Sequence, residues 1–273
     1  MTPEQVKKKI ETELKIQGKS KNTIRMYTFY NLGLLNYTKK AAEDISTDDI
    51  KEYLVSLISD NNNYPSTLAL ARASLRFFYD ELLKKNLLTE IKVPKKQKRL
   101  PEVLTKEEIA QLFNATKKLD SKLMLDFLYG SGLRVSECAS LKWSDINFDE
   151  KLGRLKHGKG AKDRLFILSD KLIIDLHEHK KTSHEKYIFD KTGNPISSRS
   201  IQRRIKTLAK KAGIKKNVHA HTLRHSFATH LIESGVDIRV IQELLAHSNL
   251  QTTQIYTHIS TKMFKSVKSP QDS

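Results

Sequence analysis

The chain has 273 residues, enough for two modest domains that each bury a core of their own. It holds 49 lysines and arginines against 31 acidic residues, a formal net charge of +18, which indicates a polyanionic partner such as nucleic acid. Its one cysteine, Cys138, excludes an internal disulfide and a zinc site of the CxxC type, and its apolar surroundings are typical of a buried, inert thiol.

The positive charge is unevenly spread along the chain. Residues 1–93 carry 15 basic and 12 acidic side chains, residues 94–101 carry 4 and 0, and residues 102–273 carry 30 and 19. We therefore expect the second and third blocks to bind nucleic acid most strongly. A lysine-rich surface kept for solubility or heat tolerance is the alternative explanation.

Residues 1–93 have the pattern of a small helical bundle. Thr2, Ser20 and Ser46 stand at N-cap positions, and Pro65 is typical of a first helical turn. Four amphipathic helices are predicted to begin at these points, the last running to about Asn86. Basic side chains on their polar faces are candidate DNA contacts, although a solvated face explains them equally well: Lys19, Lys21, Arg25, Arg72 and Arg76.

Residues 94–101 form a predicted linker. Pro94 and Pro101 bracket a run that cannot hold a helix and whose charges repel one another into an extended form. Such a linker between two domains could follow the phosphates of a duplex through its cations, Lys95, Lys96, Lys98 and Arg99.

Residues 102–273 combine helices with one β-hairpin. Leu155 and residues 165–168 flank Gly158-Lys159-Gly160, which predicts a hairpin with Lys159 at or near its tip. Helices are expected at about 106–117, 121–130, 170–181, 199–212, 222–234, 237–246 and 250–258, with a short one after Gly132. The fold class is therefore mainly α with a small β-hairpin. The N-terminus lacks the apolar segment of a signal peptide and no apolar run suits a membrane span, so we expect a soluble, cytoplasmic protein.

Two arginines in separate segments carry the chemistry of phosphate binding. Arg134 follows a Gly-Ser-Gly turn, with Glu137 one helical turn later as a supporting partner. His221 and Arg224 lie three residues apart, on one face of a predicted helix. Two guanidinium groups suit the extra charge of a pentacovalent phosphate, although each arginine by itself could be a surface charge.

Two further candidates follow near the C-terminus. His247 comes at the end of a predicted helix, where the dipole favours a protonated imidazole that can donate to a phosphate oxygen, and a plain C-capping role is the alternative. Tyr256 follows nine residues later, and a phenol becomes a nucleophile only when positive charges stabilise its anion.

The histidines also raise a metal-binding alternative. His221 and His225 have the spacing of a helical zinc pair, but Arg224 between them would repel a dication. No carboxylate or thiol ligand is near in sequence, so we expect no metal. His225 adjoins Leu223 and Phe227, which favours a buried structural role.

In order and spacing, these segments resemble the tyrosine recombinases, also called the lambda-integrase family, and most closely the Xer-type resolvases of chromosome dimers. The likeness is strong over 131–145, 156–169 and 219–259 and loose over 1–93. The family usually has glycine before the histidine, where this chain has Ala246. The residues that carry the resemblance are Arg134, His221, Arg224, His247 and Tyr256.

The resemblance implies a fold and a mechanism. It implies a helical-bundle DNA-binding domain over 1–93 and a mixed α/β catalytic domain with a C-terminal tail over 102–273, closing around DNA as a C-shaped clamp. Tyr256 would attack the scissile phosphate to give a 3′-phosphotyrosine and a free 5′ hydroxyl, and a partner strand would reverse the step. The bond energy is retained, so neither ATP, another cofactor nor an obligatory metal is implied.

The family also implies roles around this reaction. Lys159 resembles the mobile lysine that protonates the leaving 5′ oxygen, with Lys162 as a nearby alternative. Lys162 and Arg164 are further candidate DNA contacts. Strand exchange between two duplexes requires four active sites, hence a homotetramer on a double-stranded recombination site. The tail with Met263, Phe264 and Val267 could dock on a neighbouring subunit or on its own domain.

Related chemistry leaves rival functions open. A mobile-element integrase or a type IB topoisomerase would use the same residues, but the short two-domain layout favours a Xer-like resolvase of chromosome or plasmid dimers. A non-enzymatic DNA-binding protein would explain the charge and the linker. It gives no reason for the combination of Arg134, Arg224 and Tyr256.

Overall fold

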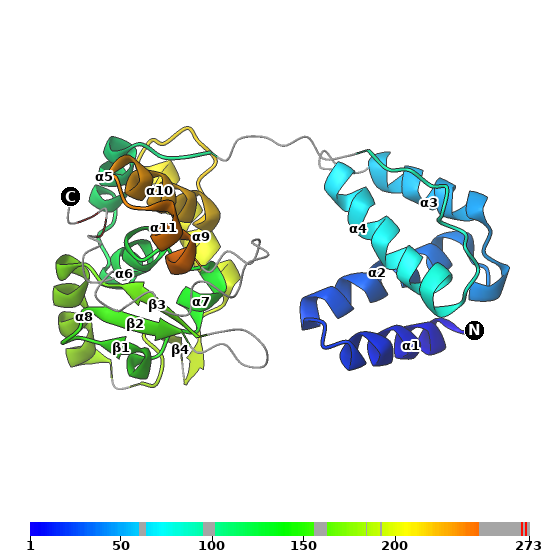
Figure 1. Ribbon diagram of the computed structural model, residues 1–273, viewed down its shortest axis with the longest axis horizontal. Helices are drawn as coiled ribbons and strands as arrows, with labels where there is room; N and C mark the ends of the chain where they lie inside the picture. Colours follow the sequence, from blue (N-terminus) through cyan, green and yellow to red (C-terminus); the bar gives the residue numbers. More distant parts are fainter. Residues whose placement is uncertain are drawn as a thin grey trace. The chain divides into compact units, whose positions relative to one another are not determined.

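Two compact units, Met1–Arg99 and Leu100–Ser273, make up the computed structural model of the chain (Figure 1). The structure describes residues 1–59, 64–94, 102–155, 163–183, 185–191, 193–245, 269 and 271. Each unit has a hydrophobic core of its own. Every helix in these described ranges is too short or too polar to cross a lipid bilayer.

Helices make up the regular structure of the first unit, and three of them begin where the sequence predicts. The Thr2 side chain accepts from the backbone N–H of Gln5, and Ser20 caps the second helix in the same way. Ser46 Oγ accepts from the N–H of Asp49 at 3.2 Å. The elements in order are α1 (Pro3–Ile16), α2 (Lys21–Thr38), η1 (Ala42–Asp44), α3 (Thr47–Ser59), α4 (Tyr64–Arg76) and η2 (Phe77–Leu82).

The core of this unit lies around α2, which packs against α1, α3 and α4. Side chains at helical spacing point inward from each helix, and Ile10, Leu34, Ile50 and Leu75 are fully buried. The last predicted helix ends earlier than expected, because η2 continues α4 as a π-helix only to Leu82. Left-handed backbone at residues 84 and 86 then prevents a further helical turn.

The second unit is also mainly helical, with short strands between its helices. The predicted helices are present, although the first ends at Asn114 rather than near 117, and the region expected at 250–258 lies outside the described residues. The elements before the sheet are α5 (Lys106–Asn114), α6 (Leu119–Leu125), η3 (Asp126–Gly130), α7 (Val135–Ala139) and η4 (Trp143–Asp145). Those after it are α8 (Asp170–Thr182), α9 (Ser198–Lys211), α10 (Ala220–Glu233) and α11 (Ile238–Leu245).

An antiparallel sheet in the order β1–β2–β3 crosses the second unit (Figure 1). The predicted hairpin is confirmed, since β2 (Leu152–Leu155) pairs with β3 (Arg164–Ile167) and Leu155 lies opposite Arg164. Two features were not predicted: β1 (Ile146–Asn147), and a ribbon of β4 (Asp190–Lys191) with β5 (Asn194–Pro195). Strands of two residues are too short to show an alternating pattern. The chain is thus mainly α with a small sheet, as expected.

A buried carboxylate lies at the π-helical turn η3. The Asp126 side chain is fully buried, and burial raises its pKa to about 7. A carboxyl group whose pKa is higher in the folded than in the unfolded chain stabilises the fold below its unfolded pKa, and this contribution is lost as the pH rises through the folded pKa. The second unit therefore loses stability as the pH rises from about 4 to about 7.

We expect Asp126→Asn to stabilise the protein at pH 8 by about 2–4 kcal/mol, because the amide has no charge to bury. The gain should shrink as the pH falls to 5, where the native carboxyl is protonated. Urea unfolding at both pH values measures it, with the exposed Asp149→Asn as the control. A gain of the same size at both pH values would contradict the assignment to ionisation.

Candidate active site

Arg134 and Glu137 lie at the start of α7, directly after a turn that only glycine can make. Gly132 has a φ of +62°, and a Cβ there would come within 2.5 Å of the Phe227 ring. The backbone N–H of Arg134 donates to Glu137 Oε2 at 2.7 Å, and its Nη1 donates to Oε1 at 2.8 Å. This double contact fixes the arginine against the helix start, as the sequence predicts.

Arg224 reaches the same place from α10. Its guanidinium is buried, with Nη1 donating to the carbonyl of Gly132 at 2.6 Å and Nη2 to the carbonyl of Leu245. Arg134 Nη2 also approaches the Leu245 carbonyl, at 3.4 Å. Residues 90 positions apart in sequence therefore converge on the C-terminal end of α11.

A third arginine, Arg164, completes the cluster. It begins β3, its side chain is buried, and its Nη2 lies 2.5 Å from Glu137 Oε2. Its Nη1 donates to the carbonyl of Leu244, one residue before the end of α11. The predicted DNA contact at Arg164 is therefore wrong for this structure, because its guanidinium is paired with the Glu137 carboxylate at 2.5 Å. Arg224 is buried as deeply but lies 4.0 Å from that carboxylate.

The cluster has more positive than negative charge. Three guanidinium groups, those of Arg134, Arg164 and Arg224, lie around the single carboxylate of Glu137 among the described residues. Burial, Arg164 and Arg134 lower the pKa of Arg224 to about 9, which leaves it charged at neutral pH. Burial raises the pKa of Glu137, but Arg164 and Arg134 outweigh it and lower the pKa overall. An anion such as a phosphate would relieve this crowding.

The histidines of α10 differ from the prediction in one respect. His221 is exposed, and burial of part of its ring, His219, Arg224 and Arg134 lower its pKa, which favours a neutral imidazole. His225 is exposed too, so the predicted buried role is wrong. The buried histidine is His230, whose Nδ1 lies 2.9 Å from the hydroxyl of Tyr129. No cluster of three metal-ligating side chains occurs among the described residues.

Several predicted site residues lie outside the described residues. These are the hairpin lysines, the residues after α11 and the linker cations: Lys159, Lys162, His247, Tyr256, Lys95, Lys96, Lys98 and Arg99. His247 follows the arginine-bound Leu245 by two positions in sequence. His247 and Tyr256 therefore follow, in sequence, the helix end that the arginines bind.

The predicted contacts of the first unit fall into two groups. Lys19, Lys21, Arg25 and Arg76 are exposed and remain candidates for DNA binding. Arg72 differs, because its Nε donates to the carbonyl of Ile91 at 2.5 Å and its Nη2 to that of Leu88 at 3.2 Å. Its guanidinium holds the chain after η2, so a structural role replaces the predicted DNA contact.

Helix α9 has a basic face that the sequence analysis missed. Ile201, Ile205 and Leu208 form its buried stripe, and the helix contains no acidic residue. The signal was available, because cations at helical spacing opposite an apolar stripe indicate a face for a polyanion. Five of the following cations are exposed and Arg204 is half-buried: Arg199, Arg203, Arg204, Lys206, Lys210 and Lys211.

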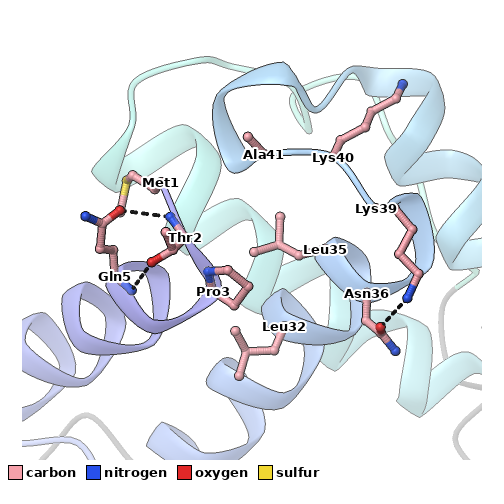
Figure 2. Close-up of a pocket in the computed structure, with 10 residues that line it drawn as sticks. All are labelled: Met1, Thr2, Pro3, Gln5, Leu32, Leu35, Asn36, Lys39, Lys40 and Ala41. Carbon is pink, nitrogen blue, oxygen red and sulfur yellow. Dashed lines mark hydrogen bonds between the residues drawn. The ribbon is translucent and has the colours of Figure 1, made fainter.

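A pocket of the first unit offers no comparable chemistry. Figure 2 shows Pro3, Leu32 and Leu35 on its apolar side. Lys39 lines the pocket and donates to Asn36 Oδ1 at 2.7 Å (Figure 2). Lys40 forms an ion pair with Asp49 at 2.8 Å. The pocket contains neither histidine nor arginine, so the cluster of the second unit is the stronger candidate site.

Family models and relatives match almost the whole chain. The model described as Phage integrase family matches residues 102–263, and that described as Phage integrase, N-terminal SAM-like domain matches residues 7–89. The tyrosine recombinase XerA of Pyrococcus horikoshii is 40% identical over 257 residues, covering 92% of this chain and 88% of that protein. The tyrosine recombinase XerD of Halalkalibacterium halodurans is 34% identical over 275 residues, covering 92% and 91%.

Solved structures share the fold. A crystal structure of XerA recombinase aligns with a TM-score of 0.53 at 28% identity and covers 96% of both chains. A lambda integrase tetramer bound to a Holliday junction aligns with a TM-score of 0.75 at 20% identity, covering 95% of this chain and 80% of that one. The helical unit and the mixed unit have the fold that these solved structures share. The chain belongs to the phage integrase family, as a tyrosine recombinase of the Xer type.

Proposed function

We propose that this protein is a site-specific recombinase that cuts and rejoins double-stranded DNA through a 3′-phosphotyrosyl intermediate. The observation that carries the proposal is the convergence of Arg134 and Arg224 on Glu137 and on the carbonyl of Leu245, in a chain of this family. The two guanidinium groups bind the non-bridging oxygens of the scissile phosphate. Their charge offsets the negative charge that grows in the transition state.

Tyr256 is the nucleophile in this mechanism. The neutral imidazole of His221 takes up the phenolic proton as the phenolic oxygen bonds to phosphorus. The bond from phosphorus to the 5′ oxygen breaks at the same time, and Lys159 supplies the proton that this leaving oxygen takes up. His221 and His247 donate hydrogen bonds to the phosphate. The phosphotyrosine retains the energy of the broken bond, so the 5′ hydroxyl of a partner strand can reverse the step without a cofactor.

DNA is held by both units and by the chain between them. We assign residues 1–93 to a helical DNA-binding domain, 94–101 to a basic linker and 102–273 to the catalytic domain with its tail. The exposed cations of the first unit and the basic face of α9 supply phosphate contacts. Lambda integrase (75–356), with a TM-score of 0.73 to this chain, is itself bound to DNA in its crystal structure.

The reaction requires four copies of the chain on two duplexes, because each exchanged strand needs its own nucleophile. A tetramer bound to a Holliday junction, as the similar lambda integrase forms, meets this requirement. The relatives named Xer recombinases match over nearly the whole chain, which favours resolution of chromosome or plasmid dimers in the cytoplasm over integration of a mobile element.

Covalent capture tests the proposed function. A duplex nicked close to the cleavage point loses a short fragment after the attack and cannot be resealed, so the protein should remain attached to the 3′ end. We expect an adduct that survives denaturation with detergent and disappears after protease digestion. Screening nicked genomic fragments supplies the unknown target site. Tight duplex binding without any adduct would instead support a non-enzymatic DNA-binding protein.

A further inference from the structure

Arg164 connects three segments of the second unit that are far apart in sequence. It lies at the first position of β3, it binds Glu137 of α7 through Nη2, and it binds the Leu244 carbonyl of α11 through Nη1. Its side chain is 4% exposed and that of Glu137 is 7% exposed. Because its guanidinium is already paired with this carboxylate, Arg164 acts through the residues that it binds rather than through the DNA.

Charge balance is the first effect of this position. Glu137 lies 2.8 Å from Arg134 and 4.0 Å from Arg224, so its carboxylate would neutralise the two arginines that we assign to the phosphate. Arg164 approaches the same carboxylate more closely, at 2.5 Å. By pairing with Glu137, it leaves more of the positive field of Arg134 and Arg224 for an incoming anion.

The second effect of Arg164 is to fix the positions of the hairpin and of α11. The hairpin of β2 and β3 carries Lys159 in its connection, and α11 leads into the segment that carries His247. A planar guanidinium can donate to two acceptors in fixed directions, which an ammonium group cannot do in the same way. Arg164 uses this fork to hold the start of β3 and the end of α11 to a single carboxylate.

We propose that Arg164 is a positioning residue of the recombinase, which balances the charge of Glu137 and ties the hairpin and the end of α11 to the arginine pair. The proposal rests on the proposed function, because its effect is on cleavage. It assigns to Arg164 no contact with the DNA.

Three variants separate charge from position. Arg164→Met keeps much of the side-chain volume but removes the charge, and we expect adduct formation in a single turnover to slow about 10–100-fold. The dissociation constant for intact duplex should change less than about threefold, because many other cations contact the phosphates. Arg164→Lys keeps the charge but lacks the paired donors of the guanidinium. Its rate of adduct formation should lie between those of Arg164→Met and the unchanged protein. The control is Arg154→Met on the neighbouring strand, an exposed arginine paired with Asp163, which should cleave at the unchanged rate.

The double variant Arg164→Met with Glu137→Gln gives the sharper test. Removing the carboxylate together with its partner restores the charge balance, so cleavage should recover at least about fivefold over Arg164→Met alone. The thermal midpoint should recover in the same direction, since the buried carboxylate that has lost its closest cation is then removed as well. A residue that only fills space would show no such rescue.

Three results would overturn the inference. These are cleavage by Arg164→Met at the unchanged rate, losses in the double variant that simply add, or a loss of duplex binding as large as the loss of cleavage. In each case the rate of the variant is compared with the rate of adduct formation by the unchanged chain. If the unchanged chain forms no adduct on any nicked fragment, the proposed function itself is rejected, and this inference is rejected with it.

Discussion

Changing Tyr256 to phenylalanine should abolish the covalent adduct with nicked DNA while leaving duplex binding within about twofold. The phenol oxygen is the atom that bonds to phosphorus in the proposed mechanism, and phenylalanine has no atom that can form this bond. The substitution removes only the hydroxyl group and keeps the aromatic ring. We therefore expect adduct formation to be lost completely. The affinity for duplex DNA should hardly change, because it depends on phosphate contacts made by other residues.

Detection of the adduct on a denaturing gel with labelled 3′ ends measures this loss, and a filter or gel-shift titration measures binding. Tyr187→Phe is the matched control, since it removes the same hydroxyl from a half-buried tyrosine beside the β-bridge of residues 142 and 187. It should form adduct at the unchanged rate. An adduct that persists in Tyr256→Phe would show that another residue is the nucleophile, even if recombination is impaired.

Local sequence was sufficient to place the starts of the helices. The N-caps at Thr2, Ser20 and Ser46 were predicted because a cap depends on a side chain and an N–H only three residues away. The hairpin of β2 and β3 was predicted for a similar reason, since its apolar residues flank a glycine-rich turn. The ends of α4 and α6 were less predictable, because both helices continue as π-helical turns, η2 and η3, that no residue pattern indicated.

The predictions that were wrong for single residues were wrong about whether the side chain is buried or exposed. Arg164 and Arg72 were candidate DNA contacts because an arginine side chain usually faces solvent. Arg164 is buried instead, because Glu137 and the end of α11 supply acceptors from segments that the sequence does not show to be adjacent. His225 was judged buried from its apolar neighbours in sequence, yet it lies on the exposed side of α10.

The convergence of the arginines could be expected only through the family resemblance. Arg134 and Arg224 are in different helices, and neither helix alone shows where the other packs. The structure adds the means by which they are held, which are Glu137 and the carbonyls of Gly132 and Leu245. These backbone acceptors leave no mark in the sequence, because every residue has a carbonyl.

Those same acceptors predict different outcomes for the two arginines. Changing either Arg134 or Arg224 to lysine should slow adduct formation about 10²–10³-fold, because the bidentate contact with the phosphate is lost. Only Arg224→Lys should also destabilise the protein. Its side chain is 6% exposed and binds the carbonyls of Gly132 and Leu245, whereas that of Arg134 is 35% exposed. A buried carbonyl that loses its donor costs about 1–3 kcal/mol.

Urea unfolding and single-turnover cleavage, measured on the same preparations, separate these effects. Arg134→Lys should unfold within about 0.5 kcal/mol of the unchanged protein, as expected for a partly exposed ion pair. Arg224→Lys should lose about 2–4 kcal/mol, because an ammonium cannot reach both carbonyls. Equal destabilisation by the two changes would mean that Arg224 does not hold α11 to the Gly132 turn. Unimpaired cleavage by either variant would remove that arginine from the proposed site.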